Sequence, residues 1–161
     1  MLAKFKQKCA TAISQPPLFF LWLAPAWVLL GICRLIINIT PFKHYAHRLG
    51  VLDGTAPRTP LITHRQEARA RIISSAIKIA AKYSPWEANC FPQAMTARCI
   101  LGLYSIPYAL FFGLRRDTHS NGNSAAEIAL KAHAWIVSGP VIVTGGASFG
   151  QYQTVGCFVS E

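Results

Sequence analysis

Acidic residues are scarce in this 161-residue chain, with six aspartates and glutamates against 16 lysines and arginines and a formal net charge of +10. None of its five cysteines forms a C-x-x-C pair, which argues against a structural zinc site. Their odd number and wide spacing argue against a disulfide scaffold, so a reducing cytoplasm is the simplest compartment. No nucleic-acid recognition motif is present, so we expect the positive charge to serve solubility, anionic lipid or an acidic protein partner, and no nucleic acid.

Charged residues are also few overall, at 14% of the chain, whereas hydrophobic residues make up 52%. This balance excludes extensive disorder. The length suits one domain with its own core plus an extension.

The longest stretch without charge covers residues 16–33, and after Arg34 the apolar sequence continues to residue 39. Three interpretations are open: a secretory signal, a membrane span, and a helix packed on a membrane surface or against protein. The small residues Ala24-Pro25-Ala26 lie inside the apolar run, which disfavours the signal. Trp22 and Trp27 suit an interfacial helix.

Glycine and proline mark the division of the chain. Pro41 ends the apolar segment, and four glycines and prolines break up residues 50–62. We therefore predict a basic and hydrophobic helical extension over 1–49, a linker over 50–62 and a catalytic core over 63–161.

Helices precede strands in the predicted core, which makes it an α+β domain. Thr63 and Gln66 form a capping-box pattern before one helix, and Asn89 is a candidate N-cap for the next. The apolar spacing and the turn residues predict helices over 64–82 and 90–103, and strands over 106–114, 132–137, 141–144 and 152–159.

A cysteine and a histidine stand at informative places in this pattern. Cys90 falls at the start of the second helix, where free backbone N–H groups favour a thiolate and can also receive an oxyanion. His133 lies in a predicted strand, where it shares one face with Trp135 while Ala134 and Ile136 share the other. This combination is typical of a thiol hydrolase or acyltransferase.

Each of these residues also has an ordinary structural interpretation. A cysteine in an apolar helix is often an inert core residue, and Cys99 and Cys157 fit that description. The remaining histidines lie in basic or polar stretches where exposure to solvent explains them: His44, His47, His64 and His119.

Three segments together resemble the B protein of lasso-peptide biosynthesis, in its B2-type form. They are Cys90-Phe-Pro-Gln-Ala-Met-Thr-Ala-Arg-Cys-Ile-Leu101, the stretch 102–113 with its Ile106-Pro107 and Gly113, and Ala132-His-Ala-Trp135. This family is a leader peptidase with a papain/transglutaminase-like core. The resemblance covers about residues 64–160 and implies two helices packed on a small antiparallel sheet, preceded by a hydrophobic helix.

The resemblance implies Cys90 as the nucleophile and His133 as the general base and acid. The family also carries an Asp about a dozen residues after the His to orient the imidazole, and here residues 141–150 hold no acid. The candidate orienting groups are therefore Thr144, Ser148, Gln151, a backbone carbonyl or, more remotely, Asp117.

The implied reaction is hydrolysis of one peptide bond in a precursor peptide, which releases the leader. The expected partners are that precursor, a separate leader-recognition protein and an ATP-dependent lasso cyclase. The chain would need neither metal nor nucleotide for its own chemistry. Two other functions stay open: a non-catalytic, membrane-associated scaffold of a maturation complex, and an acyltransferase or amidase on the same core.

Overall fold

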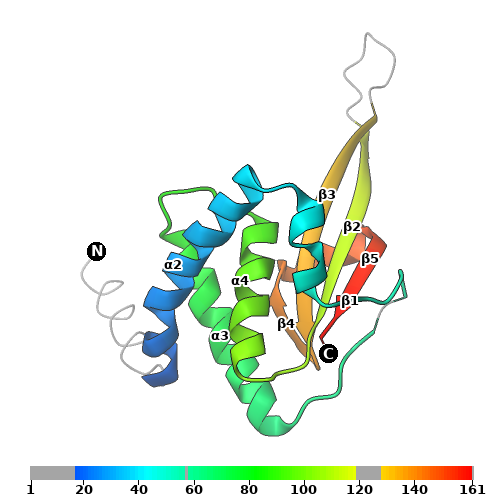
Figure 1. Cartoon of the computed structure of the whole chain (residues 1–161). Helices are drawn as coiled ribbons and strands as arrows, with labels where there is room; N and C mark the ends of the chain where they lie inside the picture. The colour runs from blue at the N-terminus through cyan, green and yellow to red at the C-terminus, as the bar shows by residue number, and fades with distance from the viewer. Residues whose placement is uncertain (1–16, 57, 119–127, 161) are drawn as a thin grey trace, which may run out of the picture.

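The computed structural model describes residues 17–56, 58–118 and 128–160, and in this part of the chain three α-helices and five strands form an α+β fold (Figure 1). The helices are α2 (Pro17–Ile39), α3 (His64–Lys82) and α4 (Cys90–Leu103). The strands are β1 (Val51–Leu52), β2 (Ala109–Thr118), β3 (Ile128–Ser138), β4 (Val141–Thr144) and β5 (Gln153–Val159). Three short 3-10 helices complete the set: η1 (Phe42–His44), η2 (Ala46–Leu49) and η3 (Gly146–Gln151).

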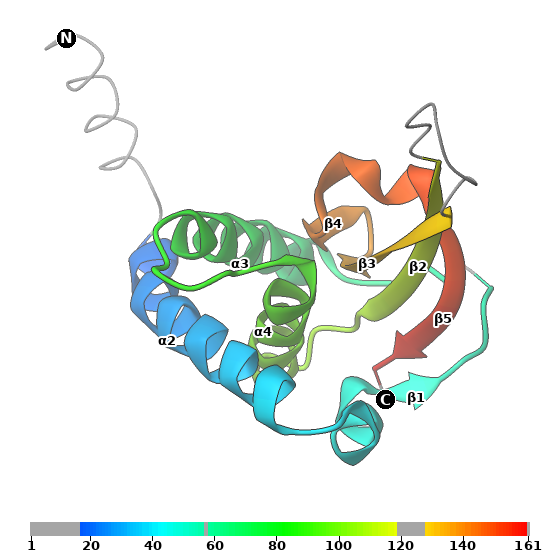
Figure 2. The ribbon, with the colours of Figure 1, turned by 90° about the horizontal axis from the view of Figure 1, so that it is seen from above.

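The five strands form one antiparallel sheet in the order β1-β5-β2-β3-β4. Helices α3 and α4 cover one face of this sheet, and α2 packs on these two helices from the side away from the sheet (Figure 2). The predicted arrangement of two helices on a small sheet, preceded by an apolar helix, is confirmed.

Helix α3 begins where the sequence predicted. The Thr63 side chain accepts from the Gln66 backbone N–H, and the Gln66 side chain accepts from the Thr63 backbone N–H, which completes the capping box. Its apolar stripe, including Ile73 and Ile77, is fully buried against α2 and α4.

Helix α4 also has the predicted bounds. Asn89 has extended backbone dihedrals as an N-cap should, but its side chain makes no capping hydrogen bond. Pro92 sits in the first turn, where a missing N–H costs little. Ala94 and Ala97 are fully buried, and such small side chains let the helix approach its neighbours closely.

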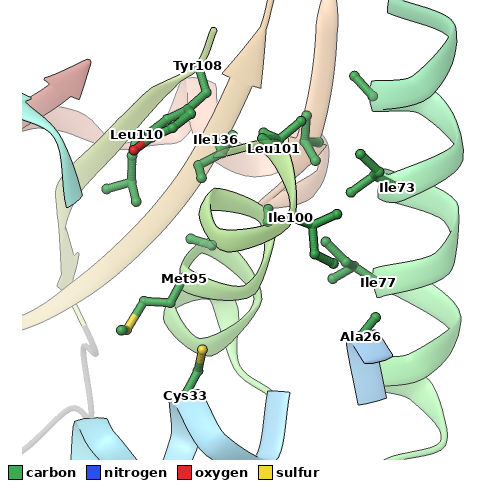
Figure 3. Close-up of a cluster of buried hydrophobic side chains, with 14 of the residues drawn as sticks. Ala26, Cys33, Ile73, Ile77, Met95, Ile100, Leu101, Tyr108, Leu110 and Ile136 are labelled. Atoms are coloured by element: carbon green, nitrogen blue, oxygen red, sulfur yellow. The ribbon is translucent and has the colours of Figure 1, made fainter. Parts of the chain in front are cut away.

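Helix α2 has two different faces. Ala26, Leu30 and Cys33 are buried in the same core cluster as Ile77 and Met95 (Figure 3). The other face exposes large apolar side chains, namely Phe20, Leu21, Val28, Ile32, Leu35 and Ile39. By length and composition α2 could cross a membrane, although a helix packed on protein passes the same test.

The sheet separates two hydrophobic clusters. The larger one lies between the sheet and the helices and contains Leu110, Ala134 and Ile136 (Figure 3). The smaller one lies on the opposite, outer face of the sheet and contains Ala109, Phe111, Trp135 and Cys157. Neighbouring residues of β2 and β3 alternate between these clusters, as strand geometry requires.

Strands β2, β3 and β1 differ most from the prediction. Strand β2 begins at Ala109 rather than at residue 106, because Pro107 has no N–H to donate to a ladder. Strand β3 begins at Ile128, before the predicted residue 132. The predicted turn over 121–123 lies outside the described residues.

Strand β1 is the third difference, because it lies inside the predicted linker and pairs with β5. Gly50 precedes it with φ +127°, and a Cβ there would lie 2.3 Å from the Val159 carbonyl oxygen. Only glycine permits this close approach of two backbones.

Candidate active site

Cys90 is the first residue of α4 and is half-buried. Its side chain packs, with that of Phe91, against the cluster between the sheet and the helices. The first N–H groups of an α-helix have no partner within the helix, so those of Cys90 and Phe91 take their partners from outside it. Thiol and donors thus belong to one helix start, which is the arrangement that acyl transfer to a cysteine needs.

The loop before Cys90 is fixed from within the core. The Ser84 hydroxyl lies 2.9 Å from the Ala81 carbonyl and 3.1 Å from the Trp86 carbonyl. The Gln93 side-chain amide donates to the Ala88 carbonyl at 2.7 Å. These bonds fix both ends of the loop over residues 84–89, which leads into Cys90.

Helix α2 holds the same loop from outside. The Trp86 indole packs against Trp27, with ring centroids 4.5 Å apart, and lies so close to Gly31 that a Cβ there would be 2.9 Å from the ring. Arg34 and Glu87 form a salt bridge at 3.0 Å. The apolar helix is therefore part of the wall around the loop that carries the thiol.

His133 lies on β3 opposite Gly113 of β2. Its half-buried imidazole stacks against Tyr152 and Trp135, with ring centroids 4.8 Å and 5.9 Å away. Its Nε2 atom lies 2.8 Å from the carbonyl oxygen of Gly145. Because a carbonyl oxygen can only accept, this contact requires the hydrogen on Nε2 and, in the neutral ring, leaves Nδ1 with its lone pair.

Gly145 stands 12 residues after His133, where the resemblance leads us to expect an aspartate. Its φ of +94° lies in the left-handed region, and a Cβ would be 2.2 Å from the Cβ of Trp135. This backbone therefore excludes an aspartate at that position. A backbone carbonyl takes the place of the acid as the partner of the imidazole.

Of the other predicted orienting side chains, the structure describes Thr144 and Gln151, and neither bonds to the imidazole. Thr144 is fully buried, and its hydroxyl has no hydrogen-bond partner among the described residues. The Gln151 side chain accepts from Arg115. The side chains of Ser148 and Asp117 lie outside the described part of the structure.

The structure does not bring Cys90 and His133 into hydrogen-bond contact within the described residues. As predicted, His133 shares a face of β3 with Trp135, while Ala134 and Ile136 share the other. The helices, however, cover the face of Ala134 and Ile136. The thiol therefore lies on the inner side of the sheet, and the imidazole lies on the outer side beside the end of β4.

A cavity of about 360 Å³ adjoins the aromatic side chains around His133. Its lining combines aromatic rings with one cation and includes Phe111, Trp135, Phe149, Tyr152 and Arg58. Such an apolar hollow with a single charged group suits an apolar side chain of a peptide.

A backbone carbonyl was among the predicted partners of the imidazole, but the sequence did not single out Gly145, because a backbone acceptor has no side chain to reveal it. Sequence reasoning missed two further groups at this site. Gln93 had a weak signal, as a polar residue in an otherwise apolar first turn. Tyr152 had none, because its contact with His133 depends on the pairing of β5 with β2.

Metal-ligating side chains do not gather anywhere in residues 17–56, 58–118 and 128–160: no group of three histidines, cysteines or acids is close enough to hold an ion.

A protein-family comparison matches residues 39–156 to the Transglutaminase-like superfamily. The matched range includes Cys90, His133 and Gly145. Comparison with curated proteins and with solved structures gave no match. Because the matched range covers most of the 161 residues, with the helix-borne cysteine and strand-borne histidine inside it, the chain belongs to the transglutaminase-like superfamily.

Proposed function

We propose that this protein is a cysteine peptidase that removes the leader from a lasso-peptide precursor. Membership of the transglutaminase-like superfamily supports cysteine-based acyl chemistry, and the motifs around Cys90, Pro107 and His133 support the narrower family. One observation carries most weight. The Gly145 carbonyl holds Nε2 of His133 and so leaves Nδ1 as a base, without any acidic side chain.

In the proposed reaction Nδ1 of His133 takes the proton of Cys90, and the thiolate attacks the scissile carbonyl carbon. The N–H groups at the start of α4 stabilise the oxyanion. The imidazolium returns its proton to the leaving amine, which frees the core peptide and leaves the leader as a thioester on Cys90. Water, deprotonated by His133, then hydrolyses the thioester.

This mechanism requires Cys90 and His133 to meet. In the structure they lie on opposite faces of β3, so we propose that binding of the precursor or of a partner protein closes the site. Unliganded enzymes often have loose catalytic contacts that tighten only with substrate. His133 lies beside the end of β4, and we propose that this part of the sheet rearranges when the site closes.

We propose three partners: the precursor peptide, a separate leader-recognition protein, and an ATP-dependent cyclase that receives the free amine. No nucleic acid, metal or nucleotide takes part in the step assigned to this chain. The protein would work in the cytoplasm, attached to a membrane surface through residues 16–39. The exposed apolar side chains of α2 and the net charge of +10 favour that attachment.

A second function is favoured by the same separation of Cys90 and His133. If the two groups never meet, the chain would be a non-catalytic, membrane-associated scaffold for the other maturation proteins. The neutral partner of His133 fits this function also, since a carbonyl stabilises an imidazolium less than a carboxylate does.

Precursor cleavage in a mixture of precursor, leader-recognition protein and this protein distinguishes the two functions. We expect the wild type to release the leader with a free carboxylate, and Cys90→Ala to lose at least about a thousand-fold in rate. His133→Ala should behave like Cys90→Ala, while His47→Ala, at an exposed histidine, should match the wild type.

Unchanged cleavage by Cys90→Ala would exclude the peptidase. A product mass that shows a transferred acyl group instead of added water would assign an acyltransferase. Correct lasso assembly by the Cys90→Ala protein, with cleavage supplied by another component, would establish the scaffold.

A further inference from the structure

A second cysteine of α4 lies in a setting quite unlike that of Cys90. Cys99 lies in the C-terminal half of the helix and is half-buried, and together with Cys33 of α2 it lines one cavity. Figure 3 shows the sulfur of Cys33 pointing from α2 towards α4. Two thiols that are 66 positions apart in the sequence are thus neighbours across the α2–α4 interface.

The two thiols differ in charge preference. The neighbouring Cys33 thiol and the adjacent Arg98 guanidinium lower the pKa of Cys99, against the opposing effect of burial. The neighbouring Cys99 thiol and its own burial raise the pKa of Cys33, which is only 3% exposed. A thiol of lowered pKa beside a second thiol is the pairing found in peroxide-reactive proteins.

Small molecules can reach this pair. A cavity of about 350 Å³ lies between α2, the segment 40–49 and α4, and both Cys33 and Cys99 line it. Its cationic lining residues are Arg48 and Arg98, with His44 nearby. Arg98 is held in place, since its Nε donates to the Tyr108 hydroxyl at 3.2 Å.

We propose that Cys99 is a peroxide-reactive thiol and that Cys33 is its resolving partner, so that oxidation joins α2 to α4 by a disulfide. The Cys99 thiolate attacks one peroxide oxygen, the O–O bond breaks, and a sulfenic acid and hydroxide form. The Cys33 sulfur then attacks the sulfenic sulfur, the S–O bond breaks, and water leaves with the Cys33 proton. In total two thiols lose two electrons, and the peroxide is reduced to two waters.

The test treats the full-length Cys90→Ala protein with hydrogen peroxide, blocks remaining thiols with N-ethylmaleimide, and maps the cross-linked peptides by mass spectrometry. We expect a peptide pair that joins residues 33 and 99 and has lost two hydrogen atoms. Cys99→Ser should abolish this pair, and Cys33→Ser should leave a sulfenic acid at residue 99 that dimedone labels.

Cys157→Ser serves as the matched control, because Cys157 is fully buried on the outer face of the sheet and its replacement should leave the cross-link unchanged. Failure of wild-type Cys33 and Cys99 to cross-link under peroxide that oxidises a free exposed thiol would overturn the proposal. The proposal would also be overturned if residue 99 of the Cys33→Ser protein were oxidised as before but gave no dimedone adduct. Because Cys90 is absent from these proteins, neither result bears on the peptidase function.

Discussion

The two cysteines of α4, Cys90 and Cys99, have different chemical surroundings because they lie at different positions on one helix. Cys90 stands at the helix start, beside backbone donors and below a loop that α2 and the core hold in place. Cys99 stands nine residues later, between a guanidinium and a second thiol. The first site offers donors for a developing oxyanion, whereas the second offers charge and a partner sulfur. We therefore propose acyl chemistry for the first and oxidation by peroxide for the second.

The largest effect that would separate the two sites comes from Gly145→Asp. The substitution supplies the acid that the lasso family carries, yet we expect cleavage to fall by about a hundred-fold or more, because the new Cβ would displace Trp135 and His133 would lose its carbonyl partner. The free energy of unfolding should fall by about 1–3 kcal/mol in urea titrations. Oxidation of Cys99 should not change.

Gly146→Asp is the control for this prediction. Gly146 has φ +64°, and a Cβ at that position would meet no described atom within 4 Å, so the variant shares the backbone strain without the collision. Cleavage that rises in Gly145→Asp would show that the carbonyl is not the partner on which His133 depends.

A smaller effect should follow from Arg98→Met, and only at Cys99. Loss of the cation should raise the pKa of Cys99, so that its alkylation by iodoacetamide begins at higher pH and slows roughly ten-fold near neutrality. Precursor cleavage should keep its rate.

Alkylation read by peptide mass gives the internal comparison, because burial raises the pKa of Cys157 and keeps that thiol slow in both proteins. If the pH dependence of Cys99 alkylation were unchanged in Arg98→Met, the Arg98 guanidinium would not be a cause of the lowered pKa of Cys99. If Arg98→Met slowed precursor cleavage as much as it slowed alkylation of Cys99, the two sites would not be independent.

The smallest effect concerns Arg34→Gln, which breaks the salt bridge to Glu87. Both side chains are partly exposed, 30% and 72%, so we expect a loss of at most about 1 kcal/mol in thermal unfolding, and less at high salt. Cleavage should slow by no more than a few-fold. Glu87→Gln and the double variant complete the cycle, and a double variant no worse than either single one would confirm that the effect belongs to the pair.

Local signals in the sequence were enough to predict helices α3 and α4 and to predict which residues share a face of β3 with His133. The Thr63–Gln66 capping box, the proline in the first turn of α4 and the alternation around His133 each act over a few residues, and the structure has them as predicted. The sequence could not show which face of β3 meets the helices. That choice depends on the packing of α3 and α4, which is a property of the whole domain.

Contacts between distant segments explain the remaining differences. The pairing of β1 with β5 and the meeting of Cys33 with Cys99 each join residues that are far apart in the chain, so no short pattern reveals them. Cys99 had the sequence context of an inert core thiol, and its neighbours in space give it a different chemistry. A backbone carbonyl was among the predicted partners of His133, but the sequence could not show which residue supplies it, since every residue has a main-chain oxygen.

The packing of Trp86 against Gly31 and Trp27 has a practical consequence for anyone preparing this protein. An apolar N-terminal helix is the first part that an experimenter would delete to gain solubility. Here that deletion would strip one side from the loop before Cys90, remove Cys33 and uncover Ile77 and Met95. A shortened protein without activity would then say nothing about the proposed peptidase function, and the full-length chain in detergent or a lipid nanodisc is the sounder starting material.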